Sequence, residues 1–168
     1  VMRYTRFVAK GINVKIRKLS LSHIAFPQAE IKTRFVGDDE KMAKIYDAAV
    51  ETFRVNAVDI YMDCPSRERA GWLCDSFFTS RVEYALTGKE KLEKCFLENF
   101  LLPEKFEFLP EGMLPMCYPG DHNDKTFIPN WAMWYVLELG EYFKRTGDKA
   151  FVEKAKPRML ALLNYFKR

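Results

Sequence analysis

A dense group of charged and aromatic side chains lies between residues 59 and 76, in the run D-I-Y-M-D-C-P-S-R-E-R-A-G-W-L-C-D-S. Three acids, two arginines and a tryptophan occupy the thirteen positions from 63 to 75: Asp63, Arg67, Glu68, Arg69, Trp72 and Asp75. Carboxylates held close together repel one another, so a fold that keeps them usually needs them for catalysis, metal binding or sugar hydroxyls. The run equally fits the solvated start of a helix, whose acids favour the helix dipole and pair with the arginines. The residues alone leave both interpretations open.

The local pattern predicts that a helix begins inside this run. Pro65 and Ser66 are typical of a helix start, with Asp63 or Ser66 as the N-cap and proline in the first turn. If the chain is helical by Glu68, then Glu68 and Asp75 are seven positions apart and lie on one face after two turns. The arginines on either side of Glu68 would be turned about 100° away from that face. The spacing therefore predicts two carboxylates that share one face.

The run D-C-P-S-R-E-R-x-G-W-x-x-D resembles the signature of the α-L-rhamnosidases of glycoside hydrolase family 78. The likeness is strong over residues 59–76 and weaker but continuous over residues 3–168. It implies a mainly α fold, an incomplete (α/α)6 six-hairpin barrel of about five helices, in residues 38–168. It also implies that two or three β-strands precede the barrel in residues 1–37, as the tail of a β-sandwich domain followed by a linker.

The resemblance also implies a role for each matching residue. Glu68 corresponds to the general acid of these inverting enzymes, and Asp63 and Asp75 to carboxylates that hold the sugar and support the acid. Trp72 corresponds to the tryptophan of the motif. Cys74 departs from the pattern, because many members carry glycine there, and this affects local packing without touching a catalytic role.

An inverting glycosidase needs an acid that protonates the leaving oxygen and a base that activates water, about 6.5–9.5 Å apart. An acid of this kind needs a raised pKa, so we expect burial and neighbouring carboxylates around Glu68, with Arg67 and Arg69 paired elsewhere. Arg67 is expected to contact the substrate. The resemblance places the base on a glutamate beyond Arg168, so we name no base. We therefore expect this chain, assayed alone, to be inactive.

The composition fits a folded globular protein. The chain has 168 residues, of which 48% are hydrophobic and 15% aromatic, and this argues against disorder. Its net charge is +4, and residues 1–38 contribute eight Lys/Arg against two Asp/Glu, so +6, which leaves −2 for the rest. The basic segment alternates like a strand and lacks the clustered basic and aromatic residues of a nucleic-acid site. No apolar run is long enough for a membrane span, so we expect neither nucleic acid nor membrane as a partner.

Four cysteines lie 10, 21 and 22 positions apart, at Cys64, Cys74, Cys95 and Cys117. No C-x-x-C pair exists and no histidine lies near them at ligand spacing, so a structural zinc site is not expected. Buried free thiols are the better interpretation, although the spacing leaves disulfides open.

Hydrophobic periodicity predicts the elements. Residues 3–10 and 12–24 alternate apolar with polar side chains, as half-buried strands do, with a turn at residues 11–13 between them. Apolar residues at helical spacing predict five helices: residues 38–56, 70–86, 89–101, 129–145 and from 149 to 168, the last with Pro157 inside.

A repeated turn predicts how these helices are arranged. Thr87-Gly88 and Thr146-Gly147 are 59 positions apart, and each closes a helix that a long loop precedes. Consecutive hairpin helices run antiparallel, so the second and fourth helices point the same way. Both long loops, and with them Glu68, should therefore lie at one end of the array, and both T-G turns at the other.

The second long loop and the helix after it carry further candidates. Trp72 and Trp131 could stack on the apolar face of a deoxysugar, whereas core packing explains Trp134 better. Asp121 and Asp124 could bind sugar hydroxyls or Ca²⁺, and simple solvation explains them equally well. No motif supports calcium, so we expect no cofactor and no metal, with Asp124 and Trp131 among the substrate-binding residues.

The resemblance thus implies hydrolysis of terminal α-L-rhamnosyl residues with inversion, acting on a rhamnose-containing oligosaccharide or glycoside. Two alternatives stay open, because fold does not fix function. One is a six-hairpin barrel that acts on another sugar; the other is a non-catalytic carbohydrate-binding or structural fragment. A periplasmic or secreted location is favoured for an enzyme that degrades glycans, whereas the oligomeric state is not determined.

Overall fold

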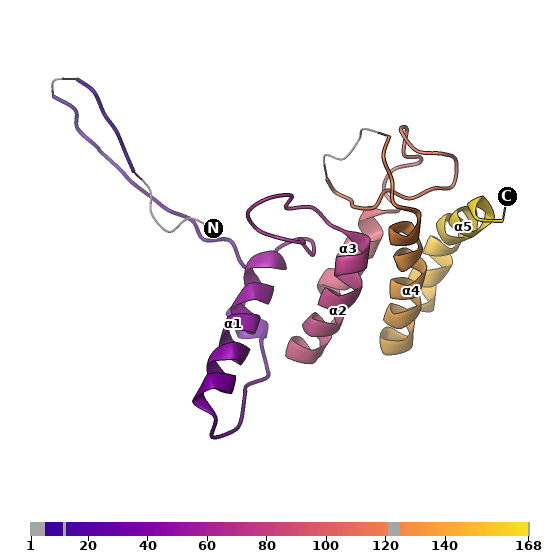
Figure 1. The fold of residues 1–168 in the computed structure, drawn as a ribbon, viewed down its shortest axis with the longest axis horizontal. Helices are drawn as coiled ribbons and strands as arrows, with labels where there is room; N and C mark the ends of the chain where they lie inside the picture. The colour runs from indigo at the N-terminus through magenta and orange to yellow at the C-terminus, as the bar shows by residue number, and fades with distance from the viewer. Residues whose placement is uncertain (1–5, 12, 121–124, 168) are drawn as a thin grey trace.

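The computed structural model describes residues 6–11, 13–120 and 125–167. In the described part an extended arm leads into one 3-10 turn and five α-helices: η1 (Gln28–Glu30), α1 (Glu40–Asn56), α2 (Leu73–Thr87), α3 (Lys91–Asn99), α4 (Pro129–Thr146) and α5 (Lys149–Tyr165). The helices stand side by side and alternate in direction (Figure 1). Helix α2 packs against α1, α3 and α4, and α4 packs against α3 and α5. The helical part of the predicted fold is confirmed.

The core lies where α2, α3 and α4 meet, and aromatic rings fill much of it. Phe96 and Phe100 of the α3 segment are fully buried, with ring centroids 5.5 Å apart. Phe100 also packs against Tyr135 of α4 at 5.6 Å, and Phe96 against Tyr61 at 5.5 Å. Tyr61, in the loop before α2, therefore packs on α3 directly, and through Phe96 and Phe100 it is linked to Tyr135 of α4. That contact fixes the position of the residues that follow in the loop.

The helix ends follow the local signals. Asp39 caps α1, because its carboxylate accepts the N–H groups of Lys41 and Met42 at 2.8 and 3.2 Å. Gly88 and Gly147 end α2 and α4 in the left-handed conformation, with φ of 67° and 66°. In Figure 1 these two turns lie at one end of the helices, and the two long loops lie at the other. The predicted separation of loops and turns is confirmed.

The N-terminal arm corrects the prediction of two or three β-strands. Residues 6–11 and 13–24 are extended but form no strand, and they project away from the helices (Figure 1). Their apolar side chains lie in solvent; Val8 is 67% and Leu21 78% exposed. Two extended segments without a further sheet or helix to cover their apolar face are not independently stable. The alternation is present in the sequence, but a pattern does not supply the partner that a sheet needs.

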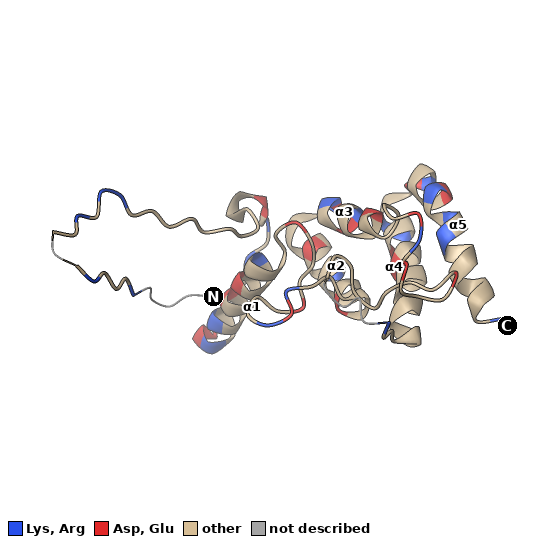
Figure 2. Ribbon diagram, turned by 90° about the horizontal axis from the view of Figure 1, so that it is seen from above, with Lys and Arg blue, Asp and Glu red and all other residues tan. Residues whose placement is uncertain are grey.

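The arm is also basic. Lys and Arg lie along it and no acid precedes Glu30, as Figure 2 shows by the blue segments. The helices, in contrast, carry both signs of charge (Figure 2).

None of the described helices combines the length and the apolar character that a membrane crossing requires. The proposed division at residue 37 between two domains stays a prediction.

All four cysteines have free thiols, as the spacing favoured. The expectation that they are buried is confirmed only for Cys117. Cys64 and Cys74 are half-buried, and Cys95 is exposed because it lies on the solvent side of α3.

Candidate active site

The predicted helix start at Pro65 and Ser66 is wrong. Residues 65–68 form a turn, and α2 begins only at Leu73. Asp63 closes the loop in front of the helix, because its N–H donates to the carbonyl oxygen of Ala70 at 3.2 Å and its side chain accepts the N–H of Ala70 at 3.1 Å. This double contact competes successfully with helical hydrogen bonding over residues 64–69. Glu68 therefore lies in a turn and does not share a helix with Asp75.

Glu68 has two polar neighbours inside the turn. Its Oε1 forms an ion pair with the Arg67 guanidinium at 2.6 Å, and its Oε2 accepts the thiol of Cys64 at 3.2 Å. These hydrogen bonds, first that from Arg67, lower the pKa of Glu68 to about 2. The expectation that both flanking arginines pair elsewhere is therefore wrong for Arg67, whose side chain is 82% exposed and can reach back to its neighbour. Arg69 is exposed and has a positive φ of 50°.

Two carboxylates and a thiol come together in this loop, and a third carboxylate lies within electrostatic range. A carboxylate oxygen of Asp63, the Sγ of Cys64 and a carboxylate oxygen of Glu68 all lie within 4.8 Å of one another. Burial of its carboxyl, and then the negative charges of Asp63 and Glu68, raise the pKa of Asp75. Asp75 as a whole residue is exposed on the first turn of α2, although its carboxyl is partly desolvated. The charge of Asp75 still lies within electrostatic range of Asp63 and Glu68.

The second long loop pairs with the end of the first. Tyr118 donates its N–H to the carbonyl oxygen of Gly71 at 2.9 Å, and Gly71 donates to Pro119 at 3.2 Å. Trp72 and Cys117 form an antiparallel bridge, and Leu73 donates to Met116 at 3.0 Å. The segments 71–73 and 116–119 therefore run side by side at the rim. This confirms that both long loops meet at the end of the array where Glu68 lies.

The approach at Gly71 leaves no space for a side chain. A Cβ there would lie 2.6 Å from the carbonyl oxygen of Tyr118 and 2.8 Å from the ring of Phe96. The glycine of the motif is thus required by close contact between the two loops, and not by a positive φ.

The tryptophans divide as expected. Trp72 and Trp131 are half-buried and pack against one small apolar cluster at the rim, made of Ala70, Met116 and Cys117. Trp134 packs between α4 and α2, with its ring centroid 4.7 Å from that of Phe77, so core packing explains a tryptophan at this position. Two predicted loop candidates, Asp121 and Asp124, lie outside the described residues, as does His122.

A cation would find three ligand atoms at Asp63, Cys64 and Glu68. Calcium takes six to eight oxygen ligands, and this set offers two carboxylates and one sulfur. A cation would also have to displace the Arg67 guanidinium from Glu68. The donor set therefore gives no support to calcium at this place.

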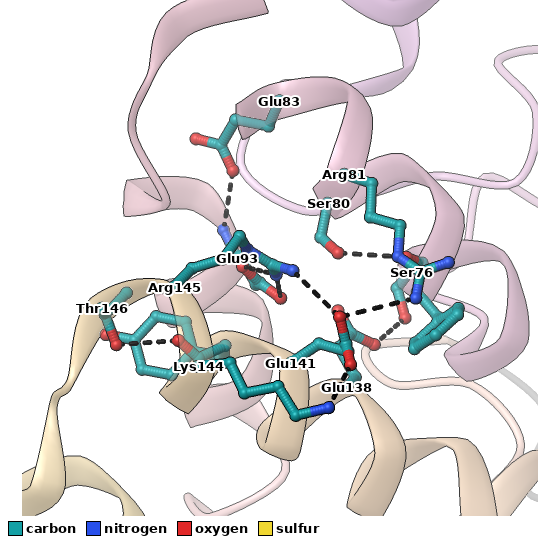
Figure 3. Close-up of polar contacts among 12 residues, drawn as sticks. Ser76, Ser80, Arg81, Glu83, Glu93, Glu138, Glu141, Lys144, Arg145 and Thr146 are labelled. Carbon is teal, nitrogen blue, oxygen red and sulfur yellow. Dashed lines mark hydrogen bonds and ion pairs between the residues drawn. The ribbon is translucent and has the colours of Figure 1, made fainter. Parts of the chain in front are cut away.

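Sequence reasoning missed a buried polar cluster between α2, α3 and α4 (Figure 3). Glu83, Glu93 and Glu138 are at most 1% exposed. One signal was available for Glu138, since it is the only acid among the apolar residues 131–139 of a helix expected to be buried on most faces. A charged residue type at such a position is rare unless it is paired.

Residues 31–168 match the family model of the bacterial alpha-L-rhamnosidase 6 hairpin glycosidase domain. The chain belongs to this family. The matched range contains all five helices and both rim loops, so the family of six-hairpin glycosidases accounts for the antiparallel array described above.

Two curated relatives are similar to the chain over most of its length. An alpha-L-rhamnosidase of Formosa agariphila is 27% identical over 140 residues, which cover 79% of this chain and 14% of the relative. An alpha-L-rhamnosidase of Alteromonas sp. (strain LOR) is 22% identical over 151 residues, which cover 89% of this chain and 16% of the relative. The chain thus spans about one seventh of the length of these relatives. No solved structure matches the chain.

Proposed function

We propose that this six-hairpin glycosidase chain supplies the acid side of a site that hydrolyses terminal α-L-rhamnosyl residues with inversion. Glu68 is the general acid, and Asp63 and Asp75 hold the sugar beside it. The observation that carries the proposal is that the carboxylates of Asp63 and Glu68 come together at the rim, within electrostatic range of Asp75, where the motif loop pairs with the second long loop. The family and the names of the two relatives point to rhamnose as the sugar.

The ion pair with Arg67 sets a condition on this role. With a pKa of about 2, Glu68 is ionised at neutral pH and has no proton to give. The proposal therefore requires that a bound sugar displaces Arg67, whose side chain is 82% exposed and is held by no other ion pair among the described residues. Once Arg67 has left, burial by the sugar and the charges of Asp63 and Asp75 would raise the pKa of Glu68 toward the range of a general acid. Arg67 would then be free to donate hydrogen bonds to sugar hydroxyls.

Trp72 and Trp131 would form an apolar wall of the site. Both are half-buried in the same small cluster at the rim, so each presents part of its ring to solvent. An indole face suits the apolar face of a deoxysugar. Asp124 remains a candidate for hydroxyl binding on the basis of the sequence.

A non-catalytic carbohydrate-binding role is the second candidate, and one observation favours it. The Arg67–Glu68 pair and the exposed Asp75 are suited to hydrogen bonding of hydroxyls without any proton transfer. The two candidates differ in whether Glu68 must be protonated.

The deciding experiment compares Glu68→Gln with wild type in the whole protein, on aryl α-L-rhamnosides with poor and with activated leaving groups. An acid role predicts that kcat falls about 10²–10⁴-fold on poor leaving groups, and much less on activated ones, which need little protonation. Glu111→Gln is the matched control, because Glu111 is an exposed glutamate of the second loop outside the carboxylate group. An equal loss on both substrate types would mean that Glu68 positions the sugar only. Sugar binding without turnover would favour the second candidate.

A further inference from the structure

The three buried glutamates between α2, α3 and α4 have no part in the proposed site, and two of them have clear partners. Glu83 accepts two backbone N–H groups from the first turn of α3, at 3.0 and 3.1 Å, and so caps that helix from α2. Glu93 accepts two hydrogen bonds from Arg145 of α4, at 2.6 and 2.7 Å (Figure 3). Burial raises the pKa of both carboxyls, and these donors oppose it by favouring the charged form.

Glu138 lacks such partners. It is fully buried on α4, and among the described residues no ion pair reaches it. Its Oε1 is buried without a hydrogen-bond partner in the described part of the chain. The nearby cation, Arg145, is bound to Glu93. A carboxylate with one bare oxygen in the core is costly, whereas a neutral carboxyl group tolerates this position better.

The contacts of Ser76 indicate where the proton lies. Ser76 Oγ is 2.6 Å from the carbonyl oxygen of Leu73 and 2.5 Å from Oε2 of Glu138. A hydroxyl has one proton, and a carbonyl oxygen only accepts. If Glu138 were ionised, both neighbours of Ser76 would be acceptors and only one contact could be a hydrogen bond. If Glu138 is protonated, its O–H donates to Ser76, and Ser76 donates to Leu73, so both contacts are satisfied.

We propose that Glu138 is held as a neutral carboxylic acid that donates a hydrogen bond to Ser76 and so fixes the first turn of α2. Leu73 opens that turn, and Ser76 directly follows Asp75. Glu138 is thereby a positioning residue for Asp75, acting from the neighbouring helix. Its effect on catalysis rests on the proposed function, whereas its protonation and its tie to α2 do not.

The surroundings of Glu138 agree with this assignment. Burial raises the pKa of Glu138 well above its ordinary value; the charge of Glu93 on α3 adds to this, while Ser76 on α2 and Arg145 on α4 oppose it. Tyr61 in the first loop and Tyr135 on α4 also lie within electrostatic range; a tyrosine hydroxyl is neutral at pH 7, and burial raises the pKa of both further. A carboxyl whose pKa is raised in the folded state makes folding less favourable as pH rises above the unfolded pKa.

The first test compares Glu138→Gln with the matched control Glu93→Gln in urea unfolding at several pH values. A glutamine amide can donate to Ser76 as the neutral acid does, so below the unfolded pKa of a glutamate, about 4.3, Glu138→Gln should change the folded-to-unfolded ratio by less than about fivefold. Its stability relative to wild type should grow as pH rises. Glu93→Gln breaks a buried ion pair and should lower the ratio by about 100-fold or more.

Infrared spectra identify the proton directly. A carbonyl stretching band of a buried protonated carboxyl should be present in wild type and in Glu93→Gln at pH 7, and absent in Glu138→Gln. If Glu138→Gln is as unstable as Glu93→Gln, or if the band survives in Glu138→Gln, the neutral state of Glu138 is refuted.

The tie to α2 is tested with Glu138→Leu, which keeps the buried volume but donates no hydrogen bond. Amide exchange at residues 75–77 should become faster in Glu138→Leu and stay unchanged in Glu138→Gln. In the whole protein, Glu138→Leu should lower kcat/KM on an aryl α-L-rhamnoside by about tenfold or more, because small displacements of positioning groups cost rate. Unchanged exchange in Glu138→Leu would refute the positioning role. If wild type lacked rhamnosidase activity, the proposed function would fall, while the exchange and infrared results would still decide this inference.

Discussion

The contact at Gly71 gives a sharp test of how the two rim loops are joined. Replacing Gly71 with alanine would place a Cβ 2.6 Å from the carbonyl oxygen of Tyr118 and 2.8 Å from the ring of Phe96. Neither neighbour can yield easily. Phe96 is fully buried between Tyr61 and Phe100, and the Tyr118 carbonyl belongs to the segment that pairs with Gly71 itself. The loops would have to separate.

The expected loss follows from these contacts. Overpacking a tight site costs about 1–3 kcal/mol, and two weakened backbone hydrogen bonds, Tyr118 to Gly71 and Gly71 to Pro119, add about 1 kcal/mol each at most. The free energy of unfolding should therefore fall by about 3 kcal/mol. Urea unfolding followed by circular dichroism measures this directly, provided that the transition is two-state.

Two other glycines separate crowding from backbone conformation. Gly140 lies within α4, and outside its own stretch of helix no atom lies within 4 Å of the position that a Cβ would take. Gly140→Ala should therefore stabilise the chain by about 0.5–1 kcal/mol. Gly88 also has open space but a φ of 67°, so Gly88→Ala should cost about 1–2 kcal/mol from conformation alone. If Gly71→Ala were no less stable than Gly88→Ala, the close pairing of the two loops would be refuted.

Three further predictions concern charge. Arg145→Met should lower the free energy of unfolding by about 3–5 kcal/mol at pH 7, since Glu93 loses its buried partner. The loss should shrink at acid pH, and a loss that did not depend on pH would contradict this interpretation. The pKa of Glu68 is lowered in the folded state, so its contribution to stability is present above its unfolded pKa and is lost as pH falls toward about 2. Arg67→Ala should weaken that dependence and move the Glu68 carboxyl titration in NMR toward its ordinary pKa, because Arg67 is the first cause of the lowered pKa and Cys64 a further one. Residues 1–168 assayed alone should not hydrolyse aryl α-L-rhamnosides, because they supply the proposed acid, Glu68, while no base is assigned among them. Turnover that required Glu68 would contradict this expectation.

Local chemistry was sufficient for much of the fold. The acidic cap at Asp39, the proline at the start of α4 and the glycines at 88 and 147 set the helix ends, since each acts on hydrogen bonds within its own turn. Because those turns are short, neighbouring helices must run antiparallel, and the two long loops must meet at one end. The sequence motif also identified the family before any coordinate was known.

Only the tertiary structure decided where α2 begins, whether the arm forms strands and which charges are buried. Helix α2 starts at Leu73 because Asp63 pairs with Ala70, and residues 71–73 pair with a segment more than forty positions away. The arm stays without strands because no sheet covers its apolar face. Glu138 carries the same side chain as Glu68, yet one is fully buried and the other lies in a half-exposed turn beside an arginine. Hydrogen bonds within a turn can be read from neighbouring residues, whereas pairing and desolvation depend on segments that meet only when the chain has folded.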